Sequence, residues 1–346
     1  GVSTDAGGNA TNGFRLSTFV GSRRISFGNL EVNTTGGTNR QVTTASNIGF
    51  NGNVTIEPSS EVVFGTSYVA GNIVNNGTFT STAVLGLASY TDGTVSATTN
   101  AQTIGGSGVY RNLAAAPTAN LTSLTVNNTN ATGVTLSVPL SVSGTLTMTS
   151  GIINTTNTNL LTLGTATAGG ILAGTPSATS MVRGPFARTI SNGNANTNYL
   201  LFPVGKVAYA PVWAAPATTA ATVMKAETFD TNTGTQSAAI ANMATNRRWE
   251  LPLVSGTINN INVRLGDAGV LATSIPVQAP SASGEYTSTF GSVATAVAGV
   301  STQSNTPVLS ASYTGYLSYA DSNACVGAPT PGNTIASSPT VCLGES

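Results

Sequence analysis

Short runs of alternating apolar and small polar residues fill the stretch from Gln102 to Gly164. They place Leu, Val, Ile or Met mostly at every second position, at residues 121–126, 134–138, 140–142, 146–148 and 161–163. A period of two is typical of a β-strand with one buried face. Glycine, asparagine and serine separate the runs, and no charged residue occurs between Asn112 and Val182. The pattern predicts short strands joined by tight turns.

Similar segments recur along the first half of the chain. Residues 30–33 match 124–127, residues 52–56 match 144–148, and residues 62–65 match 161–164. Strands that start at Gly52, Gly71 and Gly93 are 19 and 22 residues apart. This spacing fits one turn of a right-handed parallel β-helix (a solenoid), with two or three short strands per turn and asparagine ladders between turns.

An array of antiparallel hairpins forming a β-sandwich is the alternative for this half of the chain. The dipeptide Asn76-Gly77 favours it locally, because Asn-Gly is a strong hairpin signal. The shortness of the strands and their regular spacing favour the solenoid instead.

Longer strands follow from Tyr199 onward, separated by Gly, Pro and Ser turns. They are expected at residues 199–202, 223–229, 247–254, 258–265, 285–290 and 308–319. This spacing predicts an antiparallel β-sandwich. The chain is therefore predicted to be all-β, with a solenoid domain and N-terminal arm at 1–195 and an Ig-like β-sandwich at 196–323. Residues 324–346 are expected to be a linker or the start of a further module.

Charge is unusually sparse in this chain. Charged residues make up 7% of the sequence, with 12 basic and 12 acidic side chains, against about 25% in ordinary globular proteins. The 40% of hydrophobic residues argues against disorder. Nucleic acid is not expected as a partner, because no basic patch is visible. No membrane span is expected either, because no run of about 18 apolar residues exists. The Thr, Ser and Asn content points to an extracellular all-β protein.

The sequence offers little catalytic chemistry. With no histidine in the chain, Ser-His-Asp, Cys-His and His-ligated metal sites are excluded, and no cofactor or metal is expected. A carbohydrate-active parallel β-helix would need two nearby carboxylates. Glu57 and Glu61 flank a turn at residues 58–60 and are the candidates in the first half, but we interpret them as solvated turn carboxylates. We therefore expect no enzymatic activity.

Aromatic and threonine motifs offer two further binding hypotheses. Residues 247–250, Arg-Arg-Trp-Glu, resemble a sugar-binding patch, but strand alternation would bury Trp249 and point Arg248 and Glu250 outward. Trp213 and Tyr209 are interpreted as core in the same way. Thr-x-Thr runs at 78–80 and 145–147 would suit ice binding only if successive turns repeated them, which the sequence does not show.

Two cysteines and several sequons are candidate modification sites. Cys325 and Cys342 lie close together near the C-terminus, and a local disulfide is the first hypothesis, with two free buried thiols as the alternative. Eight Asn-x-Ser/Thr sequons occur, a number that an Asn- and Thr-rich chain reaches by chance. The candidate glycan sites are Asn33, Asn53, Asn76, Asn120, Asn130 and Asn154.

Three stretches carry a family resemblance. Residues 102–164, then 182–206 with 248–251, then 325–342, occur in this order. They resemble β-helix repeats, the sandwich that follows them, and the opening of an Ig-like module in large secreted surface proteins of Bacteroidetes that use type IX secretion. The resemblance implies a cell-surface or extracellular adhesin, gliding-associated protein or fibre component, and it supplies no catalytic residues.

The expected function is therefore a non-enzymatic structural subunit of an extracellular fibre, sheath or adhesin stalk. We expect it to self-assemble head-to-tail through residues 1–14 and 324–346, as a homopolymer or with neighbouring modules of one long chain. Because the sequence starts abruptly at Gly1, we expect a processed product or a fragment. The alternatives are an adhesin module that binds surface glycans and a carbohydrate-active parallel β-helix enzyme.

Overall fold

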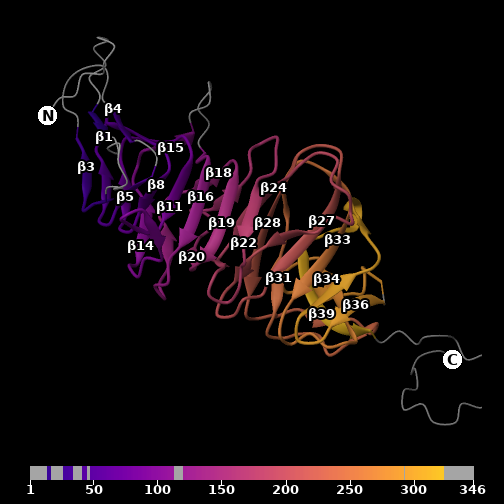
Figure 1. Ribbon diagram of the computed structural model, residues 1–346. Helices are drawn as coiled ribbons and strands as arrows, with labels where there is room; N and C mark the ends of the chain where they lie inside the picture. The colour runs from indigo at the N-terminus through magenta and orange to yellow at the C-terminus, as the bar shows by residue number, and fades with distance from the viewer. Residues whose placement is uncertain are drawn as a thin grey trace, which may run out of the picture.

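The computed structural model describes residues 14–16, 26–33, 41–44, 47–112, 120–291 and 293–322. In this part of the chain the elements are β-strands and a single 3-10 turn, Ser310–Ser312. The prediction of an all-β chain is thus confirmed. The strands follow one another along an elongated molecule, from β1–β5 at one end to β34, β36 and β39 at the other (Figure 1). Across the described residues, no helix has the length and apolarity needed to cross a membrane.

Three parallel sheets form most of the first part of the molecule, and up to Leu136 the chain visits them in a fixed order that one hairpin interrupts. The first sheet contains β1 (Phe14–Leu16), β4 (Gln41–Thr44), β7 (Glu61–Phe64), β10 (Thr78–Ser81) and β15 (Val109–Asn112). The second contains β2 (Ser26–Phe27), β5 (Ile48–Phe50), β8 (Ser67–Val69), β11 (Val84–Leu87), β16 (Ser123–Asn127), β19 (Thr145–Ser150) and β22 (Ile171–Gly174). The third contains β3 (Leu30–Val32), β6 (Val54–Ile56), β9 (Ile73–Asn75), β14 (Gln102–Gly105), β17 (Val134–Leu136), β20 (Ile153–Asn154), β23 (Val182–Arg183) and β26 (Val204–Gly205).

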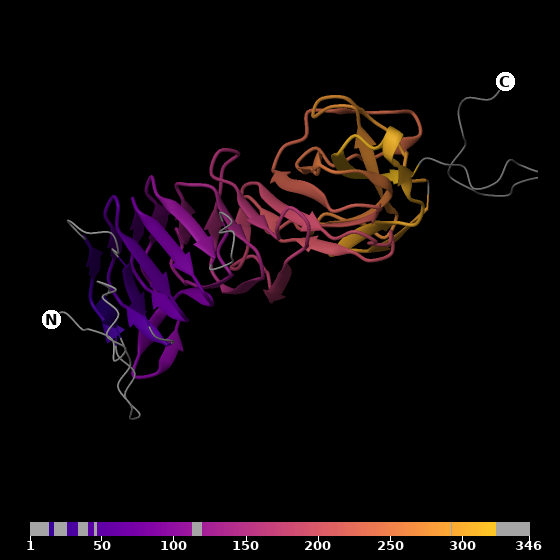
Figure 2. The ribbon, with the colours of Figure 1, turned by 90° about the horizontal axis from the view of Figure 1, so that it is seen from above.

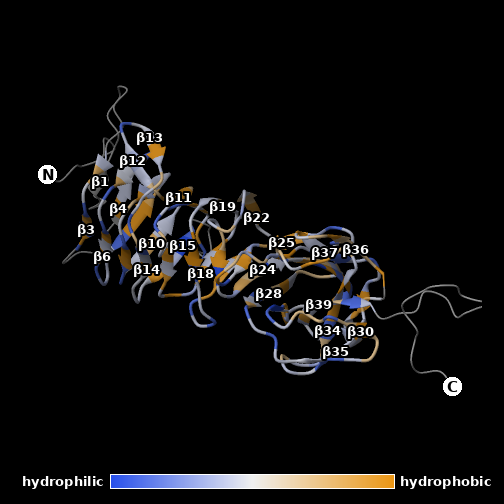
Figure 3. Cartoon of the chain, turned by 90° about the horizontal axis from the view of Figure 1, so that it is seen from below, coloured by the Kyte–Doolittle hydropathy of each residue, from blue (hydrophilic) through white to orange (hydrophobic). Residues whose placement is uncertain are grey.

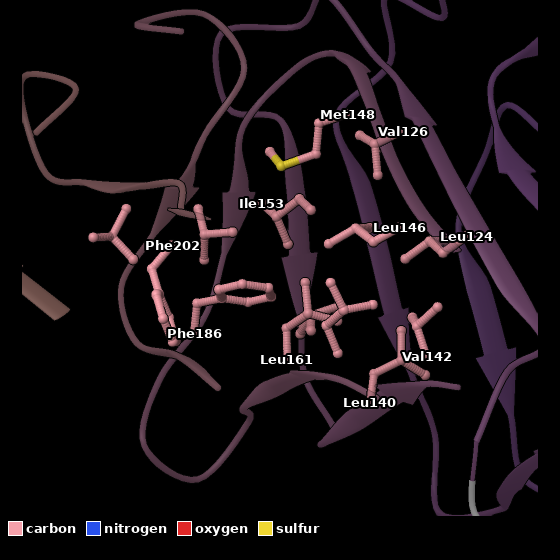
Figure 4. Close-up of a cluster of buried hydrophobic side chains, with 14 of the residues drawn as sticks. Leu124, Val126, Leu140, Val142, Leu146, Met148, Ile153, Leu161, Phe186 and Phe202 are labelled. Carbon is pink, nitrogen blue, oxygen red and sulfur yellow. The ribbon is translucent and has the colours of Figure 1, made fainter. Parts of the chain in front are cut away.

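The apolar positions of these strands are in register from one strand to the next. In the third sheet Val54 pairs with Ile73, and Ile73 pairs with Ile104, so three buried residues lie in one row. Figure 4 shows the same stacking farther along the chain, where Leu124 pairs with Leu146 in the second sheet and Leu140 pairs with Leu161 in a neighbouring parallel ladder. All these residues belong to one hydrophobic core cluster that runs from Val32 to Tyr319. Period-two alternation thus puts each strand's apolar face into this core.

The sequence matches at long offset do not mark equivalent strands. Residues 30–32 form β3 in the third sheet, whereas their match forms β16 in the second. Likewise, residues 54–56 form β6 in the third sheet, and their match lies in β19 of the second. The structural repeat is shorter, since Val54 pairs with Ile73. Segments about 90 residues apart look alike in sequence because strands of all three sheets have the same alternation of apolar and polar residues, so this likeness does not identify strands of the same sheet.

The hairpin in this part of the molecule lies elsewhere than expected. Asn76-Gly77 connects β9 to β10, which belong to different sheets. The hairpin pairs β12 (Ser89–Thr91) with β13 (Thr94–Ser96) through Asp92 and Gly93, which have φ of 48° and 86°. Two central residues with positive φ are typical of the two-residue type I′ hairpin loop, and Asp-Gly suits it.

The pairing changes from parallel to antiparallel at β24 (Phe186–Ile190). This strand continues the parallel ladder of β18 (Leu140–Val142) and β21 (Leu161–Leu163), and its other edge pairs antiparallel with β28 (Thr222–Phe229). We call residues 14–183 the parallel region and residues 186–322 the antiparallel region. Hydrophobic and near-neutral residues dominate the strands of both regions, and strongly hydrophilic residues form short stretches (Figure 3).

Two large sheets make up most of the antiparallel region (Figure 2). One extends from β28 through β31 (Arg248–Glu250) and β39 (Tyr316–Ser322) to β30 (Ile240–Ala241), with β32 (Leu253–Ser255) and β34 (Ser274–Ala279) at its sides. The other contains β25 (Leu200–Phe202), β27 (Val212–Thr218), β33 (Ile258–Gly266), β37 (Ser301–Ser304), β36 (Ala294–Val297) and β38 (Val308–Leu309). A short parallel pair joins β29 (Thr235–Gln236) to β35 (Glu285–Tyr286).

Candidate functional site

Stacked Gly-Asn turns link successive strands of the third sheet. The backbone N–H of Asn53 donates to Asn29 Oδ1, and that of Asn72 donates to Asn53 Oδ1, both at 2.8 Å. Thr103 N–H continues the ladder onto Asn72 Oδ1 at 2.8 Å. Asn29, Asn53 and Asn72 each follow a glycine, at Gly28, Gly52 and Gly71. Each asparagine therefore satisfies the turn of the next strand.

The glycines of this ladder leave room for the amides. A Cβ at Gly52 would lie 2.1 Å from Asn29 Oδ1, and one at Gly71 would lie 2.6 Å from Asn53 Oδ1. A side chain at either position would displace the acceptor. The prediction of asparagine ladders and the spacing of Gly52 and Gly71 pointed toward this arrangement, but the repeated Gly-Asn dipeptide was the sharper signal.

The candidate carboxylate Glu61 is part of an ion pair. It begins β7, and its Oε1 lies 2.6 Å from Arg111 Nη2 and accepts a hydrogen bond from Thr80 at 2.8 Å. Arg111 Nε also donates to Thr80 Oγ1 at 2.9 Å. Its interpretation as a solvated turn carboxylate was wrong, because the next two strands of its sheet supply these partners. Glu57 is half-buried in the turn before it.

The candidate glycan sites differ in exposure. Asn33 and Asn53 are exposed, Asn76, Asn130 and Asn154 are half-buried, and Asn120 is buried. Asn130 Nδ2 donates to Thr99 O at 2.7 Å, and Asn154 Nδ2 donates to Thr132 O at 2.6 Å. A glycan on either of these nitrogens would compete with a contact between successive turns. Glycosylation stays a prediction, and Cys325 and Cys342 lie outside the described residues.

The threonine runs do not form a repeated flat face. In the register of the first sheet, Thr78 pairs with Glu61 and Val109, and Thr80 pairs with Val63 and Arg111. In the second sheet Thr147 pairs with Thr125 on one side and with Ala173 on the other. Rows of threonine thus end after at most two of these strands, and the ice-binding hypothesis gains no support.

Buried charges gather at the centre of the antiparallel region. Arg247 Nε donates to Asp267 Oδ2 at 2.6 Å, and both side chains are less than 10% exposed. Arg247 also pairs with Asp230. The other oxygen of Asp267 accepts hydrogen bonds from Gly269 N at 2.7 Å and from the Tyr319 hydroxyl at 3.1 Å. All the charges of this group are paired, which is typical of a structural network.

The two tryptophans have different surroundings. Trp249 is fully buried, and its Nε1 donates to Ala210 O at 2.8 Å, so the core interpretation is confirmed. Trp213 is half-buried on β27. A Cβ at Gly266 would lie 3.1 Å from its Cζ3 atom, so the indole lies against that glycine. The same interpretation was therefore wrong for Trp213. Burial raises the pKa of half-buried Tyr209 to about 12.

Trp213 belongs to a row of side chains that crosses the six-stranded sheet. Trp213 pairs with Arg264 on β33, Arg264 with Gln303 on β37, and Gln303 with Thr295 on β36. The Arg264 guanidinium lies 5.1 Å from the ring centre of Tyr199 and 5.5 Å from that of Trp213. We call Tyr199, Trp213, Arg264 and Gln303 the tryptophan–arginine face. All four are partly exposed to solvent.

Hydrogen bonds hold the side chains of Arg264 and Tyr199 in place on this face. Arg264 Nε donates to Gln303 Oε1 at 2.8 Å, and its Nη2 donates to the same oxygen. The Tyr199 hydroxyl donates to Ser304 O at 3.4 Å. Burial raises the pKa of Tyr199, while the positive charge of Arg264 opposes the rise. The face leaves no local pattern in the sequence, because its members come from four separate segments.

A second surface cluster surrounds Phe229 on β28. The Arg248 guanidinium lies 3.8 Å from the ring centre of Phe229, and the Lys206 ammonium lies 5.4 Å from it. Lys206 pairs with Glu227 at 2.6 Å and Arg248 with Glu250 at 3.1 Å. Glu227 and Glu250 face each other across the β28–β31 ladder, and each carboxylate thus has a cation beside it. The charges of the cluster are thus balanced, although the buried Nε of Arg248 has no hydrogen-bond partner among the described residues.

Metal chemistry gains no candidate here, since no group of three or more His, Cys, Asp or Glu side chains gathers among the residues described. Comparison of the chain with protein-family models, with curated proteins and with solved structures gives no match.

Proposed function

We propose that this chain is a non-enzymatic structural module of an extracellular fibre, sheath or adhesin stalk. Its parallel region would be a right-handed parallel β-helix, and its antiparallel region a β-sandwich that covers one end of it. The observation that carries the proposal is the order in which the chain visits three in-register parallel sheets from β1 to β17, interrupted by the β12–β13 hairpin. From β18 onward the parallel ladder of β18, β21 and β24 takes the place of the first sheet in this order. A solenoid produces this order, because each turn adds one strand to every sheet.

The proposed role is mechanical. Parallel ladders, the Gly-Asn turns and one continuous core join each turn to the next along the molecule. Bending such a rod would break several backbone hydrogen bonds and expose buried apolar surface at once. A surface poor in charge would let neighbouring rods pack with little electrostatic repulsion.

The state of the carboxylates supports a role without catalysis. Two carboxyl groups are brought face to face at Glu227 and Glu250, and each lies beside a cation. Glu61 is held in the same way by Arg111. A glycosidase-type acid and base pair needs one carboxyl group free to gain or lose a proton. These pairings favour a structural role over the carbohydrate-active enzyme.

Electron microscopy of the purified chain over a range of concentrations tests the proposal. We expect rod-shaped particles that join end to end as concentration rises, because the first strands and the β34–β39 end lie at opposite ends of the molecule (Figures 1 and 2). Deletion of 1–14 or of 324–346 should abolish the joining and leave single rods. Single particles at every concentration, or cleavage of a polysaccharide by the purified chain, would contradict the proposal.

A further inference from the structure

The structure assigns a ligand class to the tryptophan–arginine face: we propose that it binds an acidic saccharide. The sugar ring would lie against the indole of Trp213, and the sugar carboxylate would pair with the guanidinium of Arg264. This inference stands independently of the mechanical role proposed above.

The first argument is the setting of Trp213. The chain has two tryptophans, and Trp249 is fully buried with its N–H satisfied. Trp213 instead points out from the six-stranded sheet, with Gly266 making room for its ring. A partly exposed indole held against the backbone is a rigid, flat apolar surface. The C–H face of a pyranose ring matches such a surface in size and polarity.

The second argument is the charge of Arg264. Five ion pairs occur among the described residues, and Arg264 takes part in none of them. Its hydrogen bonds go through Nε and Nη2 to a neutral amide, Gln303, and no described residue accepts one from Nη1. The guanidinium thus keeps its full positive charge and an edge with free donors. Arginine binds carboxylates with two parallel hydrogen bonds, so an acid group is the fitting partner.

The third argument is the supply of neutral polar groups around the row. Asn260 on β33 accepts a hydrogen bond at its Oδ1 from Asn196 Nδ2 at 2.8 Å, so two partly exposed amides lie together here. On the far side, Thr295 donates to Asn305 Oδ1 at 3.0 Å, and both are exposed. Amides and hydroxyls can donate to and accept from sugar hydroxyls. The combination suits a saccharide better than an acidic peptide.

The cluster at Phe229 provides an internal contrast. There, too, an arginine lies over an aromatic ring, but Arg248 is paired with Glu250. An acidic ligand would have to displace that carboxylate. The two sites therefore share the same arginine–aromatic contact and differ in whether the charge is already neutralised, so Arg248→Gln is a matched control.

Binding of a short oligogalacturonate to the full chain, measured by calorimetry, tests the inference. A neutral oligogalactan of equal length and polyglutamate serve as comparison ligands. We expect saturable binding of the oligogalacturonate and weaker binding of both others. Arg264→Gln should weaken oligogalacturonate binding by about tenfold and bring it to the level of the neutral sugar. Trp213→Ala should weaken both sugars, and Arg248→Gln should change neither.

Tryptophan fluorescence reports on the same site without any substitution. Acrylamide should quench mainly Trp213, because Trp249 is fully buried, and oligogalacturonate should protect Trp213 from quenching. Circular dichroism of each variant identifies any loss of fold. Equal binding of polyglutamate would assign the face to acidic peptides and overturn the inference. Absence of saturable sugar binding, or unchanged binding in a folded Arg264→Gln variant, would overturn it as well.

Discussion

The parallel and antiparallel regions achieve a unique structure by different means. In the parallel region the same contacts recur from strand to strand: an asparagine on the next turn, a glycine beside it, and aromatic rings in series. Phe50 lies 5.3 Å from Phe64, and Phe64 lies 5.0 Å from Phe79, measured between ring centres. In the antiparallel region, contacts that occur once specify the structure, such as the ion pair of Arg247 with Asp267. Repeated uncharged contacts thus specify the parallel region, whereas buried ion pairs help to specify the antiparallel region.

The largest effect is expected from the ring series of the parallel region. Phe64→Ala should lower the free energy of unfolding by about 3–5 kcal/mol, because it removes a fully buried ring and leaves a cavity between two others. Phe27 is half-buried and contacts Phe50 at 5.9 Å, so Phe27→Ala should cost clearly less. Denaturant unfolding measures both.

The same measurement tests whether the two regions unfold together. Both tryptophans lie in the antiparallel region, whereas circular dichroism reports on both regions. Because one core cluster spans them, tryptophan fluorescence and circular dichroism of Phe64→Ala should change at the same denaturant concentration. Two separate transitions would show that the regions are energetically independent.

Charge removal should affect the two regions unequally. Asp267→Ala leaves the buried guanidinium of Arg247 with one partner fewer and should cost about 3 kcal/mol. Glu61→Ala breaks a pair whose side chains are 24% and 30% exposed, and it should cost at most about 1 kcal/mol. Thermal or denaturant unfolding gives both values. Equal costs would remove the proposed difference between the regions.

Alkaline pH should destabilise the protein through its buried tyrosines. Burial raises the pKa of Tyr209 and of Tyr286 to about 12, from an ordinary value near 10, and it raises those of Tyr110 and Tyr319 as well. Between pH 10 and 12 the unfolded chain loses these protons and the folded chain keeps them. The contribution of these tyrosines to the free energy of unfolding is therefore constant below pH 10 and falls as pH rises through this window. Absorbance of tyrosinate should accordingly rise together with unfolding, and full ionisation of all tyrosines at pH 10 in the folded state would contradict this.

The smallest effect is expected at a single turn of the ladder. Asn53→Ala removes the acceptor for Asn72 N–H and should cost about 1 kcal/mol. Asn53→Asp keeps an acceptor oxygen in the same place and is the matched control. Hydrogen exchange at the amide of Asn72 measures the effect directly. Faster exchange in the alanine variant and near-normal exchange in the aspartate variant are expected.

Local features of the strands could be read from the sequence. Strands were expected at residues 134–138 and 161–163, and the structure has β17 at Val134–Leu136 and β21 at Leu161–Leu163, because a half-buried strand requires period-two alternation. Asp92-Gly93 was also a readable hairpin signal that was overlooked in favour of Asn76-Gly77. Sheet membership could not be read, since β3 and β16 have similar sequences and lie in different sheets. The same pattern fits any sheet that faces the core.

The candidate site depended still more on tertiary structure. Alternation correctly buried Trp249, but it gave the same answer for Trp213, where nothing covers the ring completely. Likewise, Glu61 pairs with Arg111, which is 50 positions later in the chain and lies two strands away in the same sheet. The sequence by itself determined an all-β chain of short, charge-poor strands, since local alternation and turn residues act over a few positions. Only the tertiary structure decided which strands are neighbours and which aromatic and charged side chains stay open to solvent, because those contacts join distant segments.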